Sequence, residues 1–205
     1  MEKKEYILNA ALELFGQKGF EGTSIRDISK KANVNVAMIS YYFGSKEKMF
    51  RRIVEQKASQ MKEILLELVN NTELTEIEKI DVVIDHYVER IFANPLFHHL
   101  LHRELSLNQR TQMHDGIIDV LLKNIMVIKK VIENGIRNQK FRKVDPEITV
   151  ATLIGTINQV LMSATMCRKL LHKDKDFDPY QSKKLKERIS THLKQLMRAH
   201  LLINN

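Results

Sequence analysis

The segment from Thr23 to Glu47 constrains the fold more than any other part of the chain, because it predicts two short helices joined by a tight turn. Ser24 followed three residues later by Asp27 is the pattern of a capping box at the start of a helix. Asn35 is a suitable cap for a second helix that ends at Gly44, where the missing side chain lets the backbone turn. The segment is therefore typical of a helix-turn-helix unit.

The second short helix has two chemically different faces. At about 100° per residue, Met38, Ile39 and Tyr42 fall on one arc, which is expected to pack inward. The other arc carries methyl and hydroxyl groups that can contact thymine methyl groups and base edges in the DNA major groove. We therefore predict a groove-contacting face of Val36, Ala37, Ser40 and Tyr41. An ordinary exposed helix surface could have the same composition, so the pattern alone leaves both interpretations open.

Further contacts, to DNA phosphates, are expected near the helix starts, where free backbone N–H groups suit phosphate oxygens. The expected residues are Thr23, Ser24, Tyr42 and Lys46. Tyr42 also lies on the inward arc, so core packing is an equally good interpretation of that residue.

Residues from about Lys4 to Arg52 resemble the DNA-binding domain of the tetracycline-repressor (TetR) family of bacterial regulators. Ser40 stands where that family usually has Tyr, and Gly44 where it often has Pro. The resemblance implies DNA-contacting roles for Tyr41 and Lys46, a ligand-binding body, and a dimer built from the last two helices. The matching segments are Ile7-Leu8-x-Ala10-Ala11-x-x-Leu14-Phe15, Gly19-Phe20-x-Gly22-Thr23-Ser24-Ile25-x-x-Ile28, Ala32-x-Val34 and Tyr42-Phe43-x-Ser45-Lys46-Glu47.

Scarce helix breakers predict an all-α protein of about nine helices. The 205 residues include only seven Gly and three Pro, and apolar residues recur at helical spacing throughout. This length suits a small domain and a larger one. We expect an N-terminal three-helix DNA-binding domain over residues 1–47 and a C-terminal helical ligand-binding and dimerisation domain over residues 48–205. A helix from Ser45 to about Asn70 would connect them without a flexible linker.

Charge and cysteine content indicate the partners and the compartment. A net charge of +8 favours a polyanionic partner. The single cysteine, Cys167, excludes an intramolecular disulfide and fits a reducing environment. The N-terminus lacks the apolar stretch of a signal peptide, and no run of about eighteen apolar residues is present. The expectation is a cytoplasmic protein without a membrane partner.

No catalytic or cofactor motif is recognisable, so the chain is not expected to be an enzyme or to carry a cofactor. His98 and His102 stand one helical turn apart in the sequence HHLLH and could share a zinc ion. No cysteine lies nearby, and Glu104 falls on a different arc. Surface or pocket-lining histidines are the simpler interpretation, and no metal site is assigned.

The helix opened by Asp145-Pro146 is expected to run to about Arg168, with apolar residues on two sides. A helix apolar on two sides must be buried on two sides, against its own core and against a second copy. The last helix, after Pro179, is amphipathic. The candidate dimer residues are Val150, Leu153, Ile157, Val160, Leu161, Leu185, Ile189, Leu193 and Leu196.

A small-molecule pocket in the body follows from the family resemblance. Its candidates combine apolar groups with a few polar ones, as ligand sites do, although most could be plain core. They are Phe92, Phe97, His99, Met126, Asn158, Gln159, Met162 and Met166.

These patterns together predict a TetR-family transcriptional repressor that binds a palindromic DNA operator as a homodimer. A small-molecule effector, mainly apolar, would release it. Two alternatives remain at this point: a metal-responsive regulator using His98 and His102, and a helical interaction module without specific DNA binding.

Overall fold

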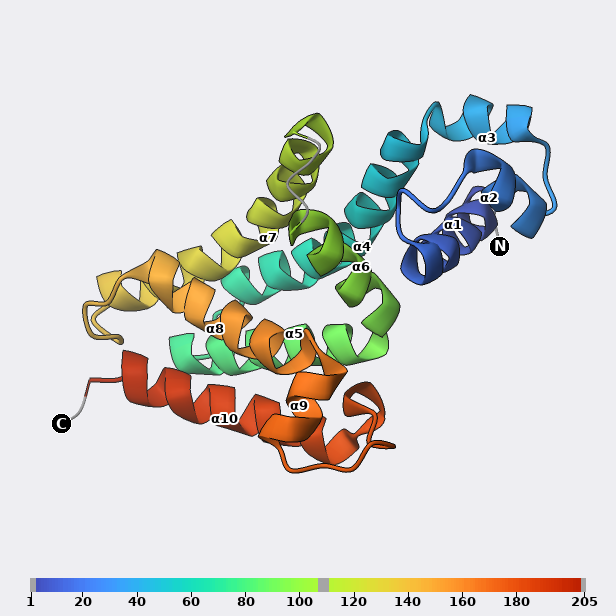
Figure 1. Ribbon diagram of the computed structural model, residues 1–205. Coiled ribbons are helices and arrows are strands. Elements are labelled where there is room, and N and C mark those ends of the chain that lie inside the picture. The colour runs from blue at the N-terminus through green and yellow to red at the C-terminus, as the bar shows by residue number, and fades with distance from the viewer. Residues whose placement is uncertain (1–2, 107–110, 204–205) are drawn as a thin grey trace. The chain divides into compact units, whose positions relative to one another are not determined.

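The computed structural model describes residues 3–106 and 111–203, apart from the side chains of residues 60 and 111–114. Within these ranges the chain is helical (Figure 1), which confirms the all-α class. The described residues form ten α-helices, one more than expected, and a short 3₁₀ helix. The helices are α1 (Lys3–Lys18), α2 (Ile25–Lys31), α3 (Val36–Phe43), α4 (Lys46–Asn70), α5 (Glu76–Ala93), α6 (Pro95–Ser106), α7 (Thr111–Arg137), α8 (Pro146–Leu161), α9 (Ala164–Leu170), η1 (Pro179–Gln181) and α10 (Lys183–Leu201).

The additional helix comes from a break in the segment that was expected to be helical to about Arg168. Instead, α8 ends at Leu161, and α9 begins at Ala164 with its axis bent by 94°. The Ser163 hydroxyl starts α9 as an N-cap, because it accepts a hydrogen bond from the Met166 N–H at 3.2 Å. The expectation of one continuous helix is therefore wrong.

Across the described ranges, no single helix is both long and apolar enough to cross a membrane. Only α8 and α9 taken together, across their bend, reach the required length and composition.

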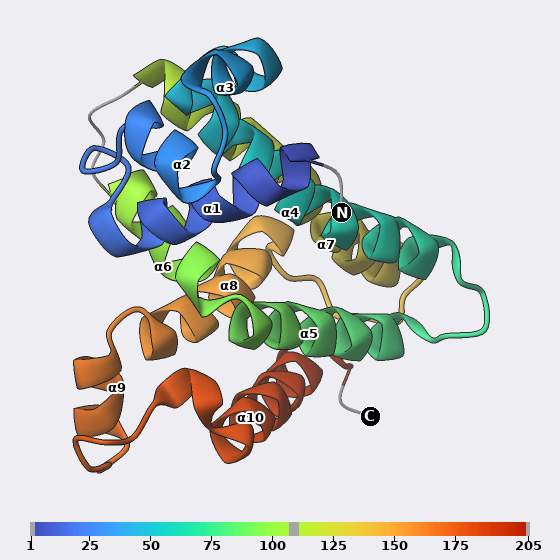
Figure 2. The ribbon, with the colours of Figure 1, turned by 90° about the vertical axis from the view of Figure 1, so that its right-hand side faces the viewer.

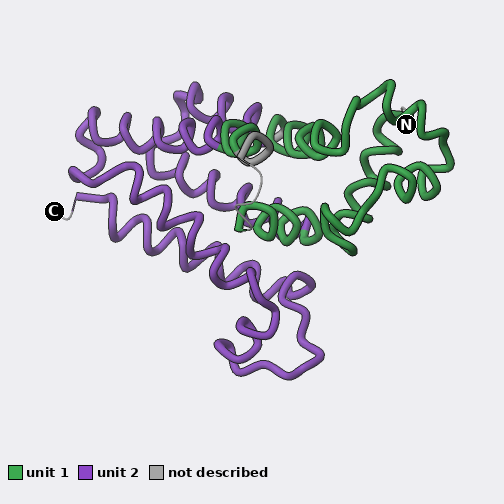
Figure 3. The backbone as a smooth tube through the Cα atoms, turned by 45° about the horizontal axis from the view of Figure 1, so that its top comes forward, with its two compact units in different colours: residues 1–60, 95–121 green, residues 61–94, 122–205 purple. Residues whose placement is uncertain are grey.

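The chain folds into two compact units, which Figure 3 colours separately. Unit 1 comprises residues 1–60 and 95–121, and unit 2 comprises residues 61–94 and 122–205. The expected domain boundary after residue 47 differs from this division. Helix α6 and the first part of α7 belong with the N-terminal helices, and both α4 and α7 contribute residues to each unit.

Three aromatic rings form the centre of the unit 1 core. Phe15, Phe20 and Phe50 are fully buried, with ring centroids 5.3 to 5.7 Å apart. Stacked and edge-to-face contacts of this kind contribute roughly 0.5–1.5 kcal/mol per pair beyond area burial. Helix α6 packs against α1 (Figure 2), where a Cβ atom at Gly16 would lie only 2.1 Å from Leu96 Cδ1. The glycine therefore permits the close approach of these two helices.

In unit 2, α5 and α10 lie side by side (Figure 1) and are joined by a ladder of charged contacts. The acidic residues of α5 recur every four positions and meet basic residues of α10, which runs in the opposite direction. Exposed ion pairs contribute little each, so this ladder mainly favours one register of the two helices. Its contacts are Asp81 with Arg198, Asp85 with Lys194 and Ser190, and Glu89 with Lys186.

Replacing Asp85 with Asn should lower the free energy of unfolding at pH 7 by less than about 1 kcal/mol. Burial alone would raise the pKa of the Asp85 carboxyl, but hydrogen bonds from Lys194 and Ser190 and the charge of Lys194 together lower it. A carboxyl with a lowered folded-state pKa stabilises the protein above its unfolded pKa, and that contribution disappears as the pH falls through the folded value. The difference between wild type and variant should therefore shrink below about pH 4.

Urea unfolding of both proteins at several pH values measures this effect. A stability difference that does not change with pH would contradict a role for the Asp85 charge.

Candidate DNA-binding site

Local hydrogen bonds shape the start of α2 and the turn between α2 and α3. The Ser24 hydroxyl accepts from the Asp27 N–H at 3.1 Å, and the Asp27 carboxylate accepts from the Ser24 N–H at 2.9 Å, which confirms the capping box. Hydrogen bonds from the hydroxyl and the N–H of Ser24 lower the pKa of the Asp27 carboxyl. Asn33 adopts a positive φ of 47°, a conformation in which Asn is enriched. Asn35 then caps α3 by accepting the Ala37 N–H at 2.7 Å.

The predicted groove-contacting face of α3 is exposed. Val36 is 40% exposed and Tyr41 is 85% exposed, and Ala37 and Ser40 between them are also exposed. On the opposite side of the helix, Ile39 is fully buried in the unit 1 core. The structure therefore brings the four predicted residues together on one outward surface of small and aromatic groups.

Tyr42 faces largely inward, in agreement with the second interpretation of this residue. It is half-buried and packs against the unit 1 core. Its ring centroid lies 5.5 Å from that of Tyr41 and 6.1 Å from that of Phe43, and the Lys4 ammonium lies 5.2 Å above its ring. The contacts of Tyr42 with Phe43 and with the unit 1 core hold the end of α3 in place, whereas Tyr41 is largely exposed.

Thr23 is not available for a side-chain contact with a phosphate, which corrects the sequence-based expectation. It is 1% exposed, and its hydroxyl donates to the carbonyl oxygens of Leu14 at 3.1 Å and Gly19 at 2.8 Å. The Gly19 carbonyl, just beyond the end of α1, thereby gains a hydrogen-bond donor. Ser24 is exposed, but its hydroxyl is engaged in the capping box with Asp27.

Lys46 also points into the protein, contrary to the expected phosphate contact. Its ammonium donates to the carbonyl oxygens of Phe20 and Thr23, each at 3.0 Å, and lies 4.4 Å from the centroid of the Phe20 ring. The Glu21 carboxylate is 3.9 Å away, and only 19% of the Lys46 side chain is exposed. The side chain therefore ties the start of α4 to the loop that precedes α2.

Replacing Lys46 with Met should destabilise unit 1 by about 2 kcal/mol, because two charge-assisted hydrogen bonds are lost. DNA binding should weaken, but the slope of log affinity against log salt should stay unchanged, because that slope counts phosphate contacts. Thermal unfolding and DNA titrations at several salt concentrations measure the two effects. If the Lys46→Met variant were as stable as wild type and its slope of log affinity against log salt were smaller in magnitude by about one, Lys46 would instead contact a phosphate directly. Lys143→Met, an exposed residue of unit 2, is the control.

Three exposed basic residues on the helices that flank α3 were not among the predicted contacts. Arg26 and Lys30 lie on α2, and Lys48 lies in the first turn of α4. Sequence reasoning favoured helix starts over helix surfaces, so it overlooked them. Because Thr23 and Lys46 are engaged inside unit 1, these three cations are better candidates for phosphate contacts.

Comparison with known proteins identifies the family. Residues 7–53 match the family described as bacterial regulatory proteins, tetR family. The probable HTH-type transcriptional regulator YttP of Bacillus subtilis is 30% identical over 140 residues, which are 67% of this chain and 67% of YttP. The chain belongs to the TetR family. The HTH-type transcriptional repressor NicS of Pseudomonas putida is 31% identical over 147 residues, 68% of this chain and 66% of NicS. The alignments thus span about two thirds of both relatives.

The fold agrees with this assignment. The crystal structure of the transcriptional regulator FadR from Bacillus subtilis, solved in complex with stearoyl-CoA, superimposes with a TM-score of 0.75 at 19% identity. The match covers 92% of this chain and 96% of FadR. The present protein is therefore a DNA-binding transcriptional regulator of the TetR family, and α1 to α3 contain its helix-turn-helix unit.

The eight candidate ligand residues of this TetR-family regulator are divided between the two units. Phe97 and His99 belong to unit 1 and the other six to unit 2. Four of those six come from the bend between α8 and α9, where the Gln159 side-chain amide approaches Met166 Sδ at 3.4 Å. Met126 is exposed on α7, whereas Phe92 is buried and contacts the Tyr180 ring. The ligand roles of all eight stay predictions.

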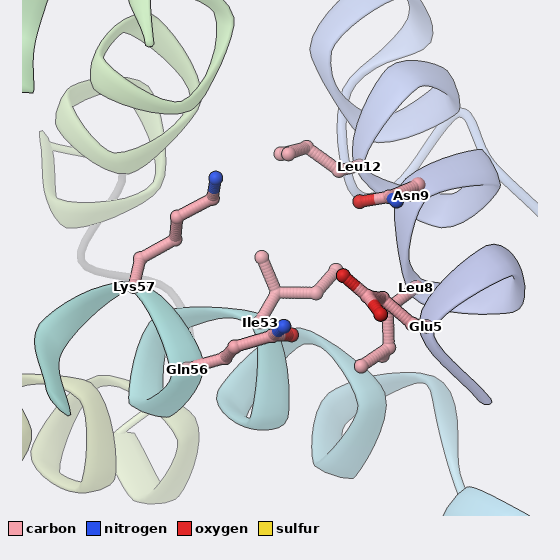
Figure 4. Close-up of a pocket in the computed structure, with 7 residues that line it drawn as sticks. All are labelled: Glu5, Leu8, Asn9, Leu12, Ile53, Gln56 and Lys57. Carbon is pink, nitrogen blue, oxygen red and sulfur yellow. The ribbon is translucent and has the colours of Figure 1, made fainter. Parts of the chain in front are cut away.

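Each unit has a hollow among its described residues. In unit 1, a small cavity of about 90 Å³ lies between α1 and α4. Figure 4 shows that α1 supplies Glu5, Leu8, Asn9 and Leu12, and that α4 supplies Ile53, Gln56 and Lys57. A larger groove of about 320 Å³ in unit 2, called here the α8–α10 groove, is lined by Thr156, Val160, Leu170, Leu171, Leu185, Arg188, Ile189 and His192. None of the candidate ligand residues lines either hollow.

Most of the candidate dimer residues are buried inside their own chain, so they do not belong to its exposed surface, and the interface itself stays a prediction. Only Val160 and Leu196 keep partial exposure. The apolar stripe of α8 packs on the core of unit 2, so the other side of the helix faces outward. A Cβ atom at Gly155 on that side would meet nothing within 4 Å. The seven buried residues are Val150, Leu153, Ile157, Leu161, Leu185, Ile189 and Leu193.

The histidine cluster packs as an aromatic pair. The rings of His98 and His102 are 4.6 Å apart in an edge-to-face arrangement, and His98 is buried. Over the described ranges, no three His, Cys, Asp or Glu residues are grouped so that they could hold a metal ion. The structure thus gives the metal-responsive alternative no support.

Proposed function

We propose that this regulator is a homodimeric repressor that binds a palindromic operator through α3 and releases it when a small molecule binds to its helical body. The outward face of α3 carries the proposal, because Val36, Ala37 and Ser40 are small enough for close approach to base edges. Buried Ile39 fixes the orientation of that face. A twofold dimer would present two such helices about one DNA turn apart and so read a palindrome.

Two similar proteins support the finer points of the proposal. NicS is named a repressor, and the FadR crystal structure contains stearoyl-CoA, a ligand with a long apolar chain. By analogy, we propose repression and an effector with an apolar part for this chain. Such an effector shifts the balance between DNA-bound and free states only by its difference in affinity for the two.

The test is a titration of the full-length protein against the DNA upstream of its own gene, over a series of salt concentrations. A DNA of the same composition with the palindrome scrambled is the control. Binding of the palindrome alone at moderate salt, with affinity that falls steeply as salt rises, would support the proposal. The proposal would be contradicted if the palindrome and its scrambled control bound equally weakly, and if a selection from genomic DNA yielded no other palindrome that the protein prefers.

The variant Ser40→Ala, Tyr41→Ala separates this proposal from a helical interaction module without specific DNA binding. Both side chains are exposed, so their loss should leave the fold intact. We expect weaker binding to the palindrome with unchanged thermal stability. Unchanged operator affinity would favour the interaction module.

A further inference from the structure

The α8–α10 groove has a largely apolar lining. It lies where α8, α9 and α10 meet (Figure 1), and its volume of about 320 Å³ is at the lower end of the range for small-molecule sites. Of the residues that line it, Leu185 and Ile189 are buried, Val160 and Leu171 are half-buried, and Leu170 is 60% exposed. The groove therefore offers apolar surface that a ligand can remove from water.

One rim of the groove is cationic. Arg188 and His192 both line it, are exposed, and stand one turn apart on α10. Exposed Lys184, one turn before Arg188, extends this row along the same side of the helix. The residues three and four positions away from Arg188 and His192 on α10 include no acid, and the described lining of the groove contains no Asp or Glu. The positive charge of this rim is therefore not neutralised by its neighbours.

The rim differs in this respect from the other side of α10. There, Lys186 and Lys194 are bound to acidic residues of α5. In contrast, no hydrogen bond or ion pair joins the side chain of Arg188 or His192 to another residue of the described ranges. The N–H donors of both side chains are therefore available to a ligand.

These donors suit an anion. The guanidinium group of Arg188 presents parallel N–H groups that match a carboxylate or a phosphate, and a ring N–H of His192 can donate to the same group. An apolar hollow with such a rim is complementary to a molecule that combines an anionic head group with an apolar chain.

We propose that the α8–α10 groove binds the effector, which is an amphipathic anion with a carboxylate or phosphate head group and a short apolar chain. Arg188 and His192 bind the head group, and the chain lies against Leu170 and Val160. The inference rests on the proposed function, because it names the place and the chemical class of the ligand to which the regulator responds.

A ligand at this place can change how two copies meet. The groove is open to solvent, so a second copy placed over it closes it above the ligand. Closure removes water from Arg188, and the bound anion then supplies the partner that a buried charge normally has. A ligand held between two copies changes the spacing of their α3 helices, and this spacing must match the two half-sites of a palindrome.

The test uses the full-length protein and calorimetric titration with probes that differ only in the head group. Octanoate is compared with octanol, and octyl phosphate distinguishes a phosphate from a carboxylate. Wild type should bind octanoate or octyl phosphate about tenfold or more tightly than octanol. Octanol binding equal to that of both anions, or no binding of either anion, would overturn the inference.

Three variants and a control assign the effect to the groove. Arg188→Gln should weaken binding of the tighter anionic probe about 10- to 100-fold and leave octanol binding unchanged, and His192→Ala should cause a smaller loss of the same kind. Leu170→Ala should weaken the binding of anion and octanol alike, about fivefold, because apolar contact area is lost. The control is Arg137→Gln, an exposed arginine of unit 2 outside the groove, which should change neither affinity. Wild-type affinity of Arg188→Gln for the anionic probe would refute the assignment.

Operator release gives a second readout. Operator affinity is measured first without a probe and then with rising concentrations of the tighter anionic probe, which should lower it. Arg188→Gln should need about 10- to 100-fold more probe for the same effect. Probe binding that leaves operator affinity unchanged would overturn the assignment of the groove to the effector.

The two proposals fail in different ways. Head-group discrimination by a protein that binds no operator would contradict the proposed function alone. Operator binding without head-group discrimination would contradict this inference alone.

Discussion

Replacing Ala37 with Glu should reduce operator affinity by at least about 100-fold while leaving the fold intact. Ala37 is exposed on the groove-contacting face of α3, between Val36 and Ser40. A carboxylate there would enter a groove lined by phosphates, and like charges brought together in an interface cost several kcal/mol. A loss of about 3 kcal/mol corresponds to roughly 150-fold in affinity.

A substitution at Ala37 should change DNA binding without changing the stability of the fold. Ala37 lies in the first turn of α3, where a negative charge interacts favourably with the helix dipole. The variant should therefore be no less stable than wild type in thermal unfolding. The control is Ala37→Gln, because the Gln side chain has nearly the same size as Glu but no charge. This variant should lose much less operator affinity. Operator affinity of Ala37→Glu within threefold of wild type would show that another surface reads the DNA.

Helix starts were the features that the sequence predicted best. The capping box of Ser24 with Asp27 forms as expected, and Asn35 and Asp145 cap the helices that follow them. Each of these contacts joins residues at most three positions apart. Contacts between residues this close in the sequence can be predicted from the sequence alone, because they do not depend on the position of any distant part of the chain.

Lys46 shows why side-chain roles were harder to predict. Its partners are carbonyl oxygens 23 and 26 residues away, in the loop around Phe20 and Thr23. Any Lys at a helix start could equally extend toward a phosphate, so the sequence alone does not decide between the two. The break before α9 has a related cause, since Ser163 lacks the Glu or Gln three residues later that completes a capping box.

Periodicity identified the apolar stripes without identifying their partners. The stripe of α8 that contains Leu153 and Ile157 is buried in the monomer, although a dimer contact was expected there. A helical wheel shows which residues share a side, whereas the choice of neighbour depends on the whole tertiary arrangement. The ladder between α5 and α10 joins residues about a hundred positions apart, and its four-residue spacing was a signal that could have been noticed.

Replacing Val160 with Glu should dissociate the proposed homodimer. Val160 is half-buried and lines the α8–α10 groove, in which Leu170 is exposed whereas Leu185 and Ile189 are buried. We propose that a second copy covers this groove. In a twofold interface every substitution occurs twice, so two carboxylates would lose water together. At about 2 kcal/mol or more each, the dimer dissociation constant should rise about 1000-fold.

Sedimentation velocity over a range of concentrations measures the dissociation constant directly. Leu66→Glu is the matched control, because Leu66 is an exposed apolar residue of unit 2 on α4, outside the groove, and its substitution should leave the dimer unchanged. The Val160→Glu monomer should also bind the palindrome far more weakly, since each copy holds only one half-site. If the dimer dissociation constant of Val160→Glu were within threefold of the wild-type value, the interface would lie elsewhere. Dissociation without loss of operator affinity would instead mean that one copy suffices to bind DNA, which contradicts palindrome recognition by a dimer.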